Sequence, residues 1–356
     1  MPEDVSFKIS VYAKTDVGMV RPGNEDSFLV LNLSTADTWT PFKVNDDPPD
    51  KLTMFNQSHY GSVLAVTDGM GGALAGEVAS RLAVECVRDR MLELQASPFY
   101  AKFPFHERLR FSIELANVYI YQMSLKRPEC QGMGATFTAV GLSGGNAYFA
   151  QVGDSRAYVI RGKEVRQVTR DQSLVGQLVQ AGHITAEEAE KHTYKNVILQ
   201  ALGAAPNLNV VVDELKLRDL DIVMLCSDGL SNKVRIDEIQ RLIDKSDSLK
   251  EACEALINLA NRRGGEDNIT TLVAQFAGGR LKPVERFDPD ETMPLKSGTG
   301  PVKADPPQPS AWGAITIPRD PALPQEIDSG LLDEEEDTLR PTGEQSLDRP
   351  TDKLTD

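Results

Sequence analysis

The chain has 356 residues, 40% of them hydrophobic, and carries a formal net charge of −15. That length suits one large domain or two ordinary ones. The acidic charge argues against nucleic-acid and anionic-membrane partners, which need a basic surface, and leaves divalent cations and basic proteins open.

Strands and helices alternate in the first part of the chain. Apolar residues alternate with polar ones from Phe7 to Ala13, which is typical of a half-buried strand. Further strands are predicted at 26–33 and 61–66, and helices at 71–94 and 105–126. Residues 34–60 contain the run Asp46-Asp47-Pro48-Pro49-Asp50 and predict a long loop inserted between two strands.

Three successive strands are predicted next, at 135–142, 146–152 and 155–161, and Ser143-Gly144-Gly145 indicates a hairpin between the first two. Beyond them, helices are predicted at 173–181, 186–192, 237–244 and 249–262, and strands at 210–215, 221–227 and 269–276. Hairpins combined with paired helices favour an α+β fold, in which two stacked antiparallel sheets are flanked by helices.

The composition changes sharply after Ala277. Residues 278–356 hold 17 acidic and 9 basic residues, their prolines are clustered, and their apolar residues follow no period. Such a segment buries too little surface to offset its ordering entropy. We therefore expect a folded domain over residues 1–277 and a disordered, acidic, proline-rich tail over residues 278–356.

The cysteines and the N-terminus bear on the compartment. The four cysteines are far apart and form no CxxC pair, which disfavours a thiolate metal site. Residues 1–15 lack the apolar run of a signal peptide, and no stretch approaches the roughly 18 apolar residues of a membrane-spanning helix. We expect reduced thiols in a cytoplasmic protein without membrane insertion, although association with a membrane-bound partner stays open.

Several acidic residues lie at the ends of predicted buried strands rather than on solvated faces. They are Asp68, Asp154, Asp228, Asp267 and the pair Glu25-Asp26. A single Asp-Gly after a strand is usually a turn. If several such strand ends converge, however, the like charges raise one another's pKa unless a cation is present.

The residue types indicate which cation. Hard divalent cations prefer oxygen ligands, and Mg²⁺ typically takes one or two carboxylates together with waters. A cluster of Asp and Glu without Cys or paired His favours Mg²⁺ or Mn²⁺ over zinc.

Six short runs match a known family in that family's order. They are Arg21-Pro22-Gly23-Asn24-Glu25-Asp26-Ser27, Val66-Thr67-Asp68-Gly69-Met70-Gly71-Gly72, Gly134-Ala135-Thr136, Val152-Gly153-Asp154-Ser155-Arg156, Cys226-Ser227-Asp228-Gly229-Leu230 and Gly265-Glu266-Asp267-Asn268-Ile269-Thr270. With these runs, residues 7–277 resemble the bacterial metal-dependent protein phosphatases of the protein phosphatase 2C type. Residues 34–59 and the tail lie outside the resemblance.

The resemblance implies a four-layer α-β-β-α sandwich with two metal ions, and in many bacterial members three, in a cleft at one end. The implied ligands are Glu25, Asp26, Asp68, the Gly69 carbonyl, Asp154, Asp228 and Asp267. Asp68 would bridge two ions, and Asp154 with Asp228 would supply the third. Arg21 matches the arginine that grips the substrate phosphate, a task that suits its planar fork. Asn268 is expected behind the ligands.

The implied reaction is hydrolysis of phosphoserine and phosphothreonine in proteins by a water that bridges the metal ions. The two ions lower the pKa of this water and screen the phosphate. The activity would reverse serine/threonine kinase signalling, so the implied partners are phosphorylated proteins, among them kinases and their substrates.

One position departs from the eukaryotic pattern. Eukaryotic relatives carry a histidine directly after the Asp-Gly pair, where this chain and bacterial relatives have another residue, here Met70. We favour a metal-bound water as the general acid. The four histidines lie outside the motifs and are interpreted as surface or packing residues. His183 and His192 fall in residues 171–202, which resemble the family's mobile flap, and are the histidines considered for substrate contact.

Two alternatives stay open. The same fold would suit a metal-binding pseudophosphatase, which loss of a metal carboxylate would signal. The tail could instead act as a regulatory interaction module. Thr292 and Thr338 each follow two carboxylates and precede an apolar residue, and once phosphorylated they would suit a phosphothreonine-reader domain. The plainer interpretation of the tail is a solvated tether.

Overall fold

The computed structural model describes residues 6–41, 48–71, 75–284, 286–287 and 293–294. The chain divides into two units, residues 1–308 and residues 309–356, and every described residue belongs to the first. Both tail threonines named above, Thr292 and Thr338, lie outside the described residues.

One sheet has six strands, each antiparallel to its neighbours. Across the sheet they are β10 (Glu164–Gln167), β9 (Arg156–Arg161), β12 (Ile222–Cys226), β13 (Ile269–Ala277), β1 (Lys8–Asp16) and β4 (Met54–Asn56). Side chains of β1 alternate between buried and half-buried, as its sequence pattern predicts.

The second sheet has eight strands, again all antiparallel. Its path is β14 (Met293–Pro294), β11 (Val211–Lys216), β8 (Asn146–Val152), β7 (Phe137–Ser143), β5 (Ser62–Met70), β2 (Asp26–Asn32) and β3 (Asp37–Trp39), and β6 (Gly134–Ala135) pairs with the end of β5. All seven residues of β2 are buried, because both faces of this strand are covered.

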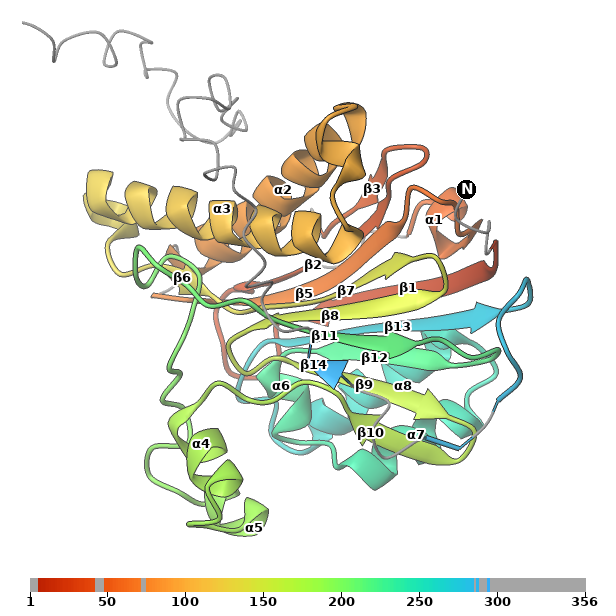
Figure 1. Ribbon diagram of the computed structural model, residues 1–356. Helices are drawn as coiled ribbons and strands as arrows, with labels where there is room; N and C mark the ends of the chain where they lie inside the picture. The colour runs from red at the N-terminus through yellow and green to blue at the C-terminus, as the bar shows by residue number, and fades with distance from the viewer. Residues whose placement is uncertain (1–5, 42–47, 72–74, 285, 288–292, 295–356) are drawn as a thin grey trace, which may run out of the picture. The chain divides into compact units, whose positions relative to one another are not determined.

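Helix pairs cover the outer faces of both sheets (Figure 1). The long helices are α2 (Ala75–Ala96) and α3 (Phe105–Lys126) on the eight-stranded sheet, and α7 (Ile236–Lys245) and α8 (Leu249–Arg262) on the six-stranded sheet. The short ones are α1 (Asp50–Thr53), α4 (Leu174–Gln180), α5 (Ala186–Glu190), α6 (Asp228–Ser231) and the 3₁₀ turns Tyr100–Lys102 and Pro128–Cys130. None of the helices in the described ranges is long and apolar enough to span a membrane.

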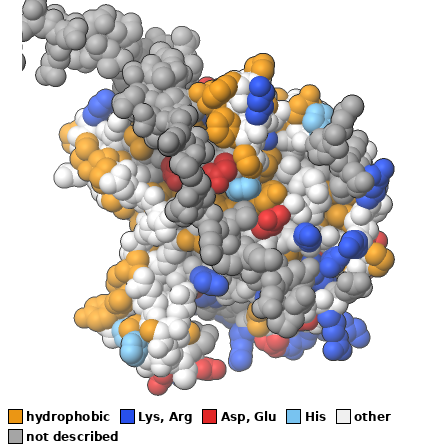
Figure 2. All heavy atoms as spheres, viewed as in Figure 1, with side chains coloured by type: hydrophobic (Ala, Val, Ile, Leu, Met, Phe, Trp, Pro, Cys, Tyr) orange, Lys and Arg blue, Asp and Glu red, His pale blue; other side chains and the backbone are white. Residues whose placement is uncertain are grey.

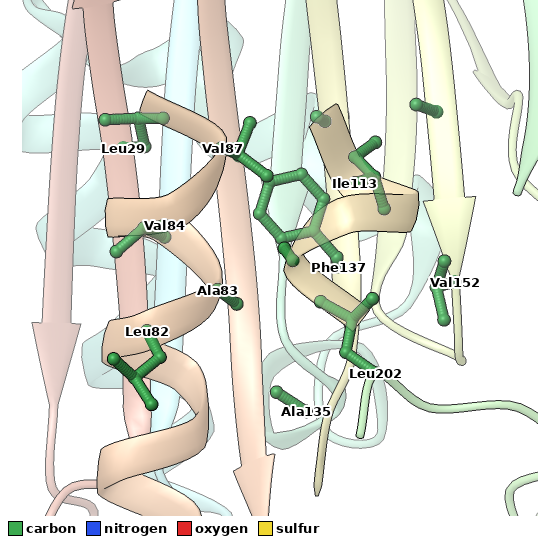
Figure 3. Close-up of a cluster of buried hydrophobic side chains, with 14 of the residues drawn as sticks. Leu29, Leu82, Ala83, Val84, Val87, Ile113, Ala135, Phe137, Val152 and Leu202 are labelled. Atoms are coloured by element: carbon green, nitrogen blue, oxygen red, sulfur yellow. The ribbon is translucent and has the colours of Figure 1, made fainter. Parts of the chain in front are cut away.

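Three hydrophobic clusters lie between four layers. The first packs α2 and α3 on the eight-stranded sheet, with Val87, Ile113 and Phe137 at its centre (Figure 3). The second lies between the two sheets, and the third joins the six-stranded sheet to α7 and α8. The predicted α-β-β-α sandwich is therefore confirmed.

The segment 34–60 differs from the long loop expected there. It carries β3, α1 and β4, with residues 42–47 outside the described ranges. Trp39 is 4% exposed and packs edge-on against Phe28, with ring centroids 5.0 Å apart. The prolines that suggested a loop stand directly before α1, a position that proline tolerates. Elements of three or four residues are too short to show a period.

The packed part of the chain extends beyond Ala277, where the sequence predicted that the folded domain ends. Phe287 is 7% exposed, belongs to the inter-sheet cluster, and lies under the guanidinium groups of Arg161 and Arg166, at 4.6 and 4.4 Å from its ring centroid. β14 adds a further strand beside β11. A lone aromatic residue in a polar segment has no period, which is why the sequence does not indicate this packing.

Candidate active site

Two aspartates face each other across neighbouring strands at one end of the sandwich. Asp26 opens β2 and is directly opposite Asp68 of β5 in the strand register. In the other sheet, β1 ends where β13 begins, with Asp16 opposite Ile269. Because β13 contacts both β2 and β5, the acidic ends of the two sheets meet here.

Asp68 is fixed through its backbone. Its N–H donates to Thr136 Oγ1 at 2.9 Å, and its carbonyl accepts from the Thr136 N–H at 2.8 Å. The Thr136 hydroxyl also contacts the Ser155 hydroxyl at 2.7 Å. Thr136, in the run Gly134-Ala135-Thr136, therefore helps to position Asp68.

Asp26 is held by a serine from the other sheet. Ser227 Oγ donates to Asp26 Oδ2 at 2.7 Å, while the Thr270 N–H donates to Ser227 Oγ at 3.0 Å. The second carboxylate oxygen of Asp26, Oδ1, is buried without a hydrogen-bond partner. Burial is the largest cause that raises the pKa of Asp26 to about 7, although the bond from Ser227 opposes it.

Asp228 reaches the same place from the first turn of α6. Its Oδ2 accepts from Asn232 Nδ2 at 3.0 Å, and its buried Oδ1 has no partner. Burial, followed by the charge of Asp267, raises the pKa of Asp228. Burial also raises the pKa of Asp68 well above its usual value, with further contributions from Asp26 and Asp228. Buried carboxyl groups that raise one another's pKa are relieved by a proton or a cation between them.

Asp267 lies at the exposed side of this cluster and pairs with Arg21. Arg21 Nε lies 2.9 Å from Asp267 Oδ1, and Nη2 donates to Oδ2 at 3.0 Å, so the pair is bidentate. Hydrogen bonding to Asp267 is the first cause that raises the pKa of Arg21. Both side chains remain accessible, at 48% and 38% exposure, which leaves the guanidinium at the mouth of the site.

Asn268 ties three backbone segments together behind Asp267. Its Oδ1 accepts from the Glu25 N–H at 2.8 Å, and its Nδ2 donates to the carbonyls of Val17 and Gly23, both at 2.9 Å. The residue is 4% exposed. Asn268 thus holds the backbones of residues 17, 23 and 25 next to Asp267.

Glycine is required beside Glu25. A Cβ at Gly69 would lie 2.1 Å from the Gly76 carbonyl oxygen, and the Gly69 N–H donates to the Glu25 carbonyl at 3.1 Å. A Cβ at Gly76 would lie 2.8 Å from the Glu25 carboxylate. Glu25 is thus packed against the start of α2, and burial is the first cause that raises its pKa.

Asp154 completes the acidic set after the positive-φ turn at Gly153. Burial, followed by the charge of Asp228, raises the pKa of Asp154 to about 7. In the described part of the chain, no group of three or more His, Cys, Asp or Glu side chains is close enough together to hold a metal ion as it stands. The carboxylates nevertheless lie near enough for their charges to interact, as Asp68 does with Asp26 and Asp228.

Comparison with known proteins agrees with this arrangement. Residues 44–274 match the family model described as protein phosphatase 2C. The serine/threonine phosphatase stp of Listeria welshimeri is 34% identical over 262 residues, which cover 74% of this chain and 94% of that protein. This chain belongs to the protein phosphatase 2C family. It is a metal-dependent serine/threonine protein phosphatase.

Solved structures share its fold. The phosphatase PstP/Ppp of Mycobacterium tuberculosis is 31% identical, with a TM-score of 0.61, over 76% of this chain and all of that one. A second structure, the catalytic domain of PstP in complex with two manganese ions, is 30% identical, with a TM-score of 0.60, over 76% of this chain and 100% of that one.

The segment 171–202 of the phosphatase projects as a flap that carries α4 and α5 (Figure 1). Its base is closed by backbone bonds from Leu174 to Val197 at 2.9 Å and from Leu199 to Gln172 at 2.8 Å. Figure 2 shows hydrophobic side chains on this projection, and Tyr194 is 58% exposed. His183 and His192 belong to the flap, where His183 is exposed and His192 is half-buried.

The sequence interpretation missed several supporting residues. Ser227 and Thr136 stand inside the quoted runs, beside Asp228 and in the run that follows α3, yet their hydroxyl contacts depend on strand pairing. Arg156 likewise clamps Asp171 at the base of the flap, with Nη2 2.6 Å from Oδ2. Ser227 directly precedes the strand-end residue Asp228, and this position is what could have indicated its role from the sequence.

Proposed function

We propose that the carboxylates at this end of the sheets bind two Mn²⁺ or Mg²⁺ ions, with a third near Asp154 and Asp228. Protein phosphoserine and phosphothreonine would be hydrolysed there by water. In this proposal Asp68 bridges two ions. The further ligands are Glu25, Asp26, the Gly69 carbonyl, Asp154, Asp228 and Asp267.

The convergence of Asp26, Asp68 and Asp228 is the observation that carries the proposal. Oδ1 of Asp26 and Oδ1 of Asp228 are buried without partners, and a buried carboxylate oxygen needs a donor or a cation. The set is entirely oxygen, which suits a hard divalent ion. The charges of Asp26 and Asp228 both raise the pKa of Asp68, and a cation held among these carboxylates would offset that repulsion.

When bound, the ions supply a nucleophilic water of lowered pKa and screen the charge of the phosphate. Arg21 holds the phosphate. Its bonds to Asp267 use Nε and Nη2, and a guanidinium has five N–H donors, so others remain for phosphate oxygens. Asn268 and Thr136 keep the backbones of Glu25 and Asp68 in place during the reaction.

A cysteine nucleophile is disfavoured by the state of all four thiols. Burial raises the pKa of Cys86 and of Cys226 to about 12, and it also raises that of Cys130 and Cys253. The thiolate is the reactive form of cysteine, so these residues are inert near neutral pH. The proposed reaction uses water as its nucleophile and needs none of these thiols.

The test is the Asp68→Asn variant, measured with a phosphothreonine peptide under saturating Mn²⁺. We expect kcat to fall by more than about 100-fold, since loss of an outer-shell partner alone costs 10–100-fold. Glu164→Gln, a change to an exposed carboxylate on β10, is the matched control and should keep wild-type turnover. A near-wild-type kcat in Asp68→Asn would contradict the proposed role of Asp68 as a metal ligand.

The proposed substrates are phosphorylated proteins in a kinase signalling pathway in the cytoplasm. The four free cysteines fit a reducing compartment. Kinases and their substrates are the proposed partners. Recruitment by a phosphothreonine reader through Thr292 or Thr338 belongs to the same proposal, and it would be tested by mapping phosphorylation sites after incubation with candidate kinases.

A further inference from the structure

Two large apolar side chains stand exposed directly before Arg21. Met19 is 69% exposed and Val20 is 65% exposed, in the loop that joins β1 to β2. Single exposed apolar residues are ordinary. Two consecutive ones beside an acidic catalytic site are less readily explained by chance.

The loop that carries them is held rigidly. The Met19 N–H donates to the Gly265 carbonyl at 2.7 Å, and Asn268 Nδ2 bonds the carbonyls at both ends of the loop, at 2.9 Å each. Gly18 has φ of +79°, and a Cβ there would lie 2.2 Å from the Asp267 carbonyl oxygen. The backbone of this turn is therefore fixed by its contacts, and it holds Met19 and Val20 in exposed positions.

The position of the loop relates it to the reaction. Arg21 pairs with Asp267 at the mouth of the site. Consecutive Cα atoms are 3.80 Å apart, so Met19 and Val20 begin within about 8 Å of the Arg21 Cα. Met19 and Val20 are therefore within reach of the residues that flank a phosphate bound at Arg21.

We propose that Met19 and Val20 form a contact surface for a bulky apolar side chain next to the phosphorylated residue of the protein substrate. The inference rests on the proposed function and adds a sequence preference to it. Removing an apolar side chain from water on contact favours binding in proportion to the area buried. A rigid loop loses little entropy when that contact forms, and the thioether of Met19 adapts to different partners.

The test uses phosphothreonine peptides of equal length. They differ only at the residue directly before the phosphothreonine and the residue directly after it. One peptide carries Leu before it, one carries Leu after it, and one carries Ser on both sides. With Mn²⁺, we expect the wild type to prefer at least one Leu peptide by about tenfold in kcat/KM, mostly through KM. That is the lower end of what one apolar contact in a pocket provides.

The variants assign the preference to the loop. Met19→Gln combined with Val20→Thr should reduce the preference to nearly one, whereas Met19→Leu should retain it. Met54→Gln is the matched control, because Met54 is 53% exposed and pairs with Ser10 of β1. Ser10 is six residues from Asp16, which corresponds to about 20 Å along a strand.

Each result is decisive. Equal kcat/KM for all three peptides in the wild type, or a preference that survives the double substitution, would overturn the inference. Hydrolysis of p-nitrophenyl phosphate by the wild type separates the two levels, because turnover of this small substrate without peptide preference leaves the proposed function standing. Absence of turnover on every substrate would contradict both the proposed function and the inference that rests on it.

Discussion

Asp26 and Asp68 are directly opposite each other on β2 and β5, at the point where the two sheets meet. Like charges in this position destabilise a sheet, and both carboxyl groups have a raised pKa. The pairing makes sense in a protein that places a cation between them. In the proposed function these two residues hold the ions, so a pairing that lowers the stability of the sheet would serve the reaction.

The first prediction concerns Arg21. Arg21→Ala should raise KM for a phosphothreonine peptide by about 10–100-fold, because a hydrogen bond to a charged group is worth about 1.5–3 kcal/mol. Arg21→Lys should recover part of the loss, since the charge remains and the bidentate fork does not. The measurement is steady-state kinetics at saturating Mn²⁺. A fall in kcat with KM unchanged would argue against a contact with bound phosphate.

The second prediction separates the ions. Asp154 and Asp228 are proposed to serve a third ion, while Asp68 serves the first two. Asp154→Asn should therefore lower kcat far less than Asp68→Asn and should shift the Mn²⁺ concentration that gives half-maximal activity. Titration of activity against Mn²⁺ measures both effects. A loss as large as that of Asp68→Asn, at every Mn²⁺ concentration, would contradict a separate third site.

The third prediction is a pH dependence of the metal-stripped protein. The pKa of Asp154 and that of Asp26 are each raised to about 7, against roughly 3.9 in an unfolded chain. Between these pH values the folded state binds more protons than the unfolded state. The stabilisation that these two carboxyl groups contribute is therefore complete below about pH 4 and is lost as pH rises through about 7.

The stripped protein should accordingly melt at a lower temperature at pH 8 than at pH 5.5, and added Mn²⁺ should reduce the difference. Thermal denaturation measures it. Asp154→Asn removes one titrating carboxyl, so its melting temperature should change less with pH. A stripped wild type that is more stable at pH 8 would show that these carboxyl groups do not carry the pH dependence.

The fourth prediction concerns Phe287. Phe287→Ala should cost about 3 kcal/mol of unfolding free energy, because it leaves a cavity beside Arg161 and Arg166. For a domain of this size the melting temperature should fall by about 5–10 °C.

Truncation should repeat the result. A chain that ends at residue 277 should melt early, and one that ends at residue 308, the limit of the first unit, should match the full chain. Val284→Ala is the control substitution, because Val284 is 42% exposed. Equal melting temperatures for the two truncated chains would mean that Phe287 adds no stability.

The sequence predicts the fold and draws attention to the acidic residues of the site, but it does not predict which side chains hold those residues in place. Strand-end aspartates such as Asp68 and Asp228 stand out because each follows a buried apolar run. That Asp26 lies opposite Asp68 depends on strand register, which side-chain alternation does not specify between two buried strands. Ser227 acts across the sheets, so its bond to Asp26 appears only when the end of β12 is placed beside β2. Asn268 is expected behind the ligands, but the three backbone segments that it joins are not.

The most direct test is release of phosphate from a phosphothreonine peptide by protein that has been stripped with EDTA and then supplied with Mn²⁺. We predict no release from the stripped protein, recovery of full activity on addition of Mn²⁺, and no comparable recovery in Asp68→Asn. Full activity after exhaustive chelation would contradict a metal-dependent reaction at these carboxylates.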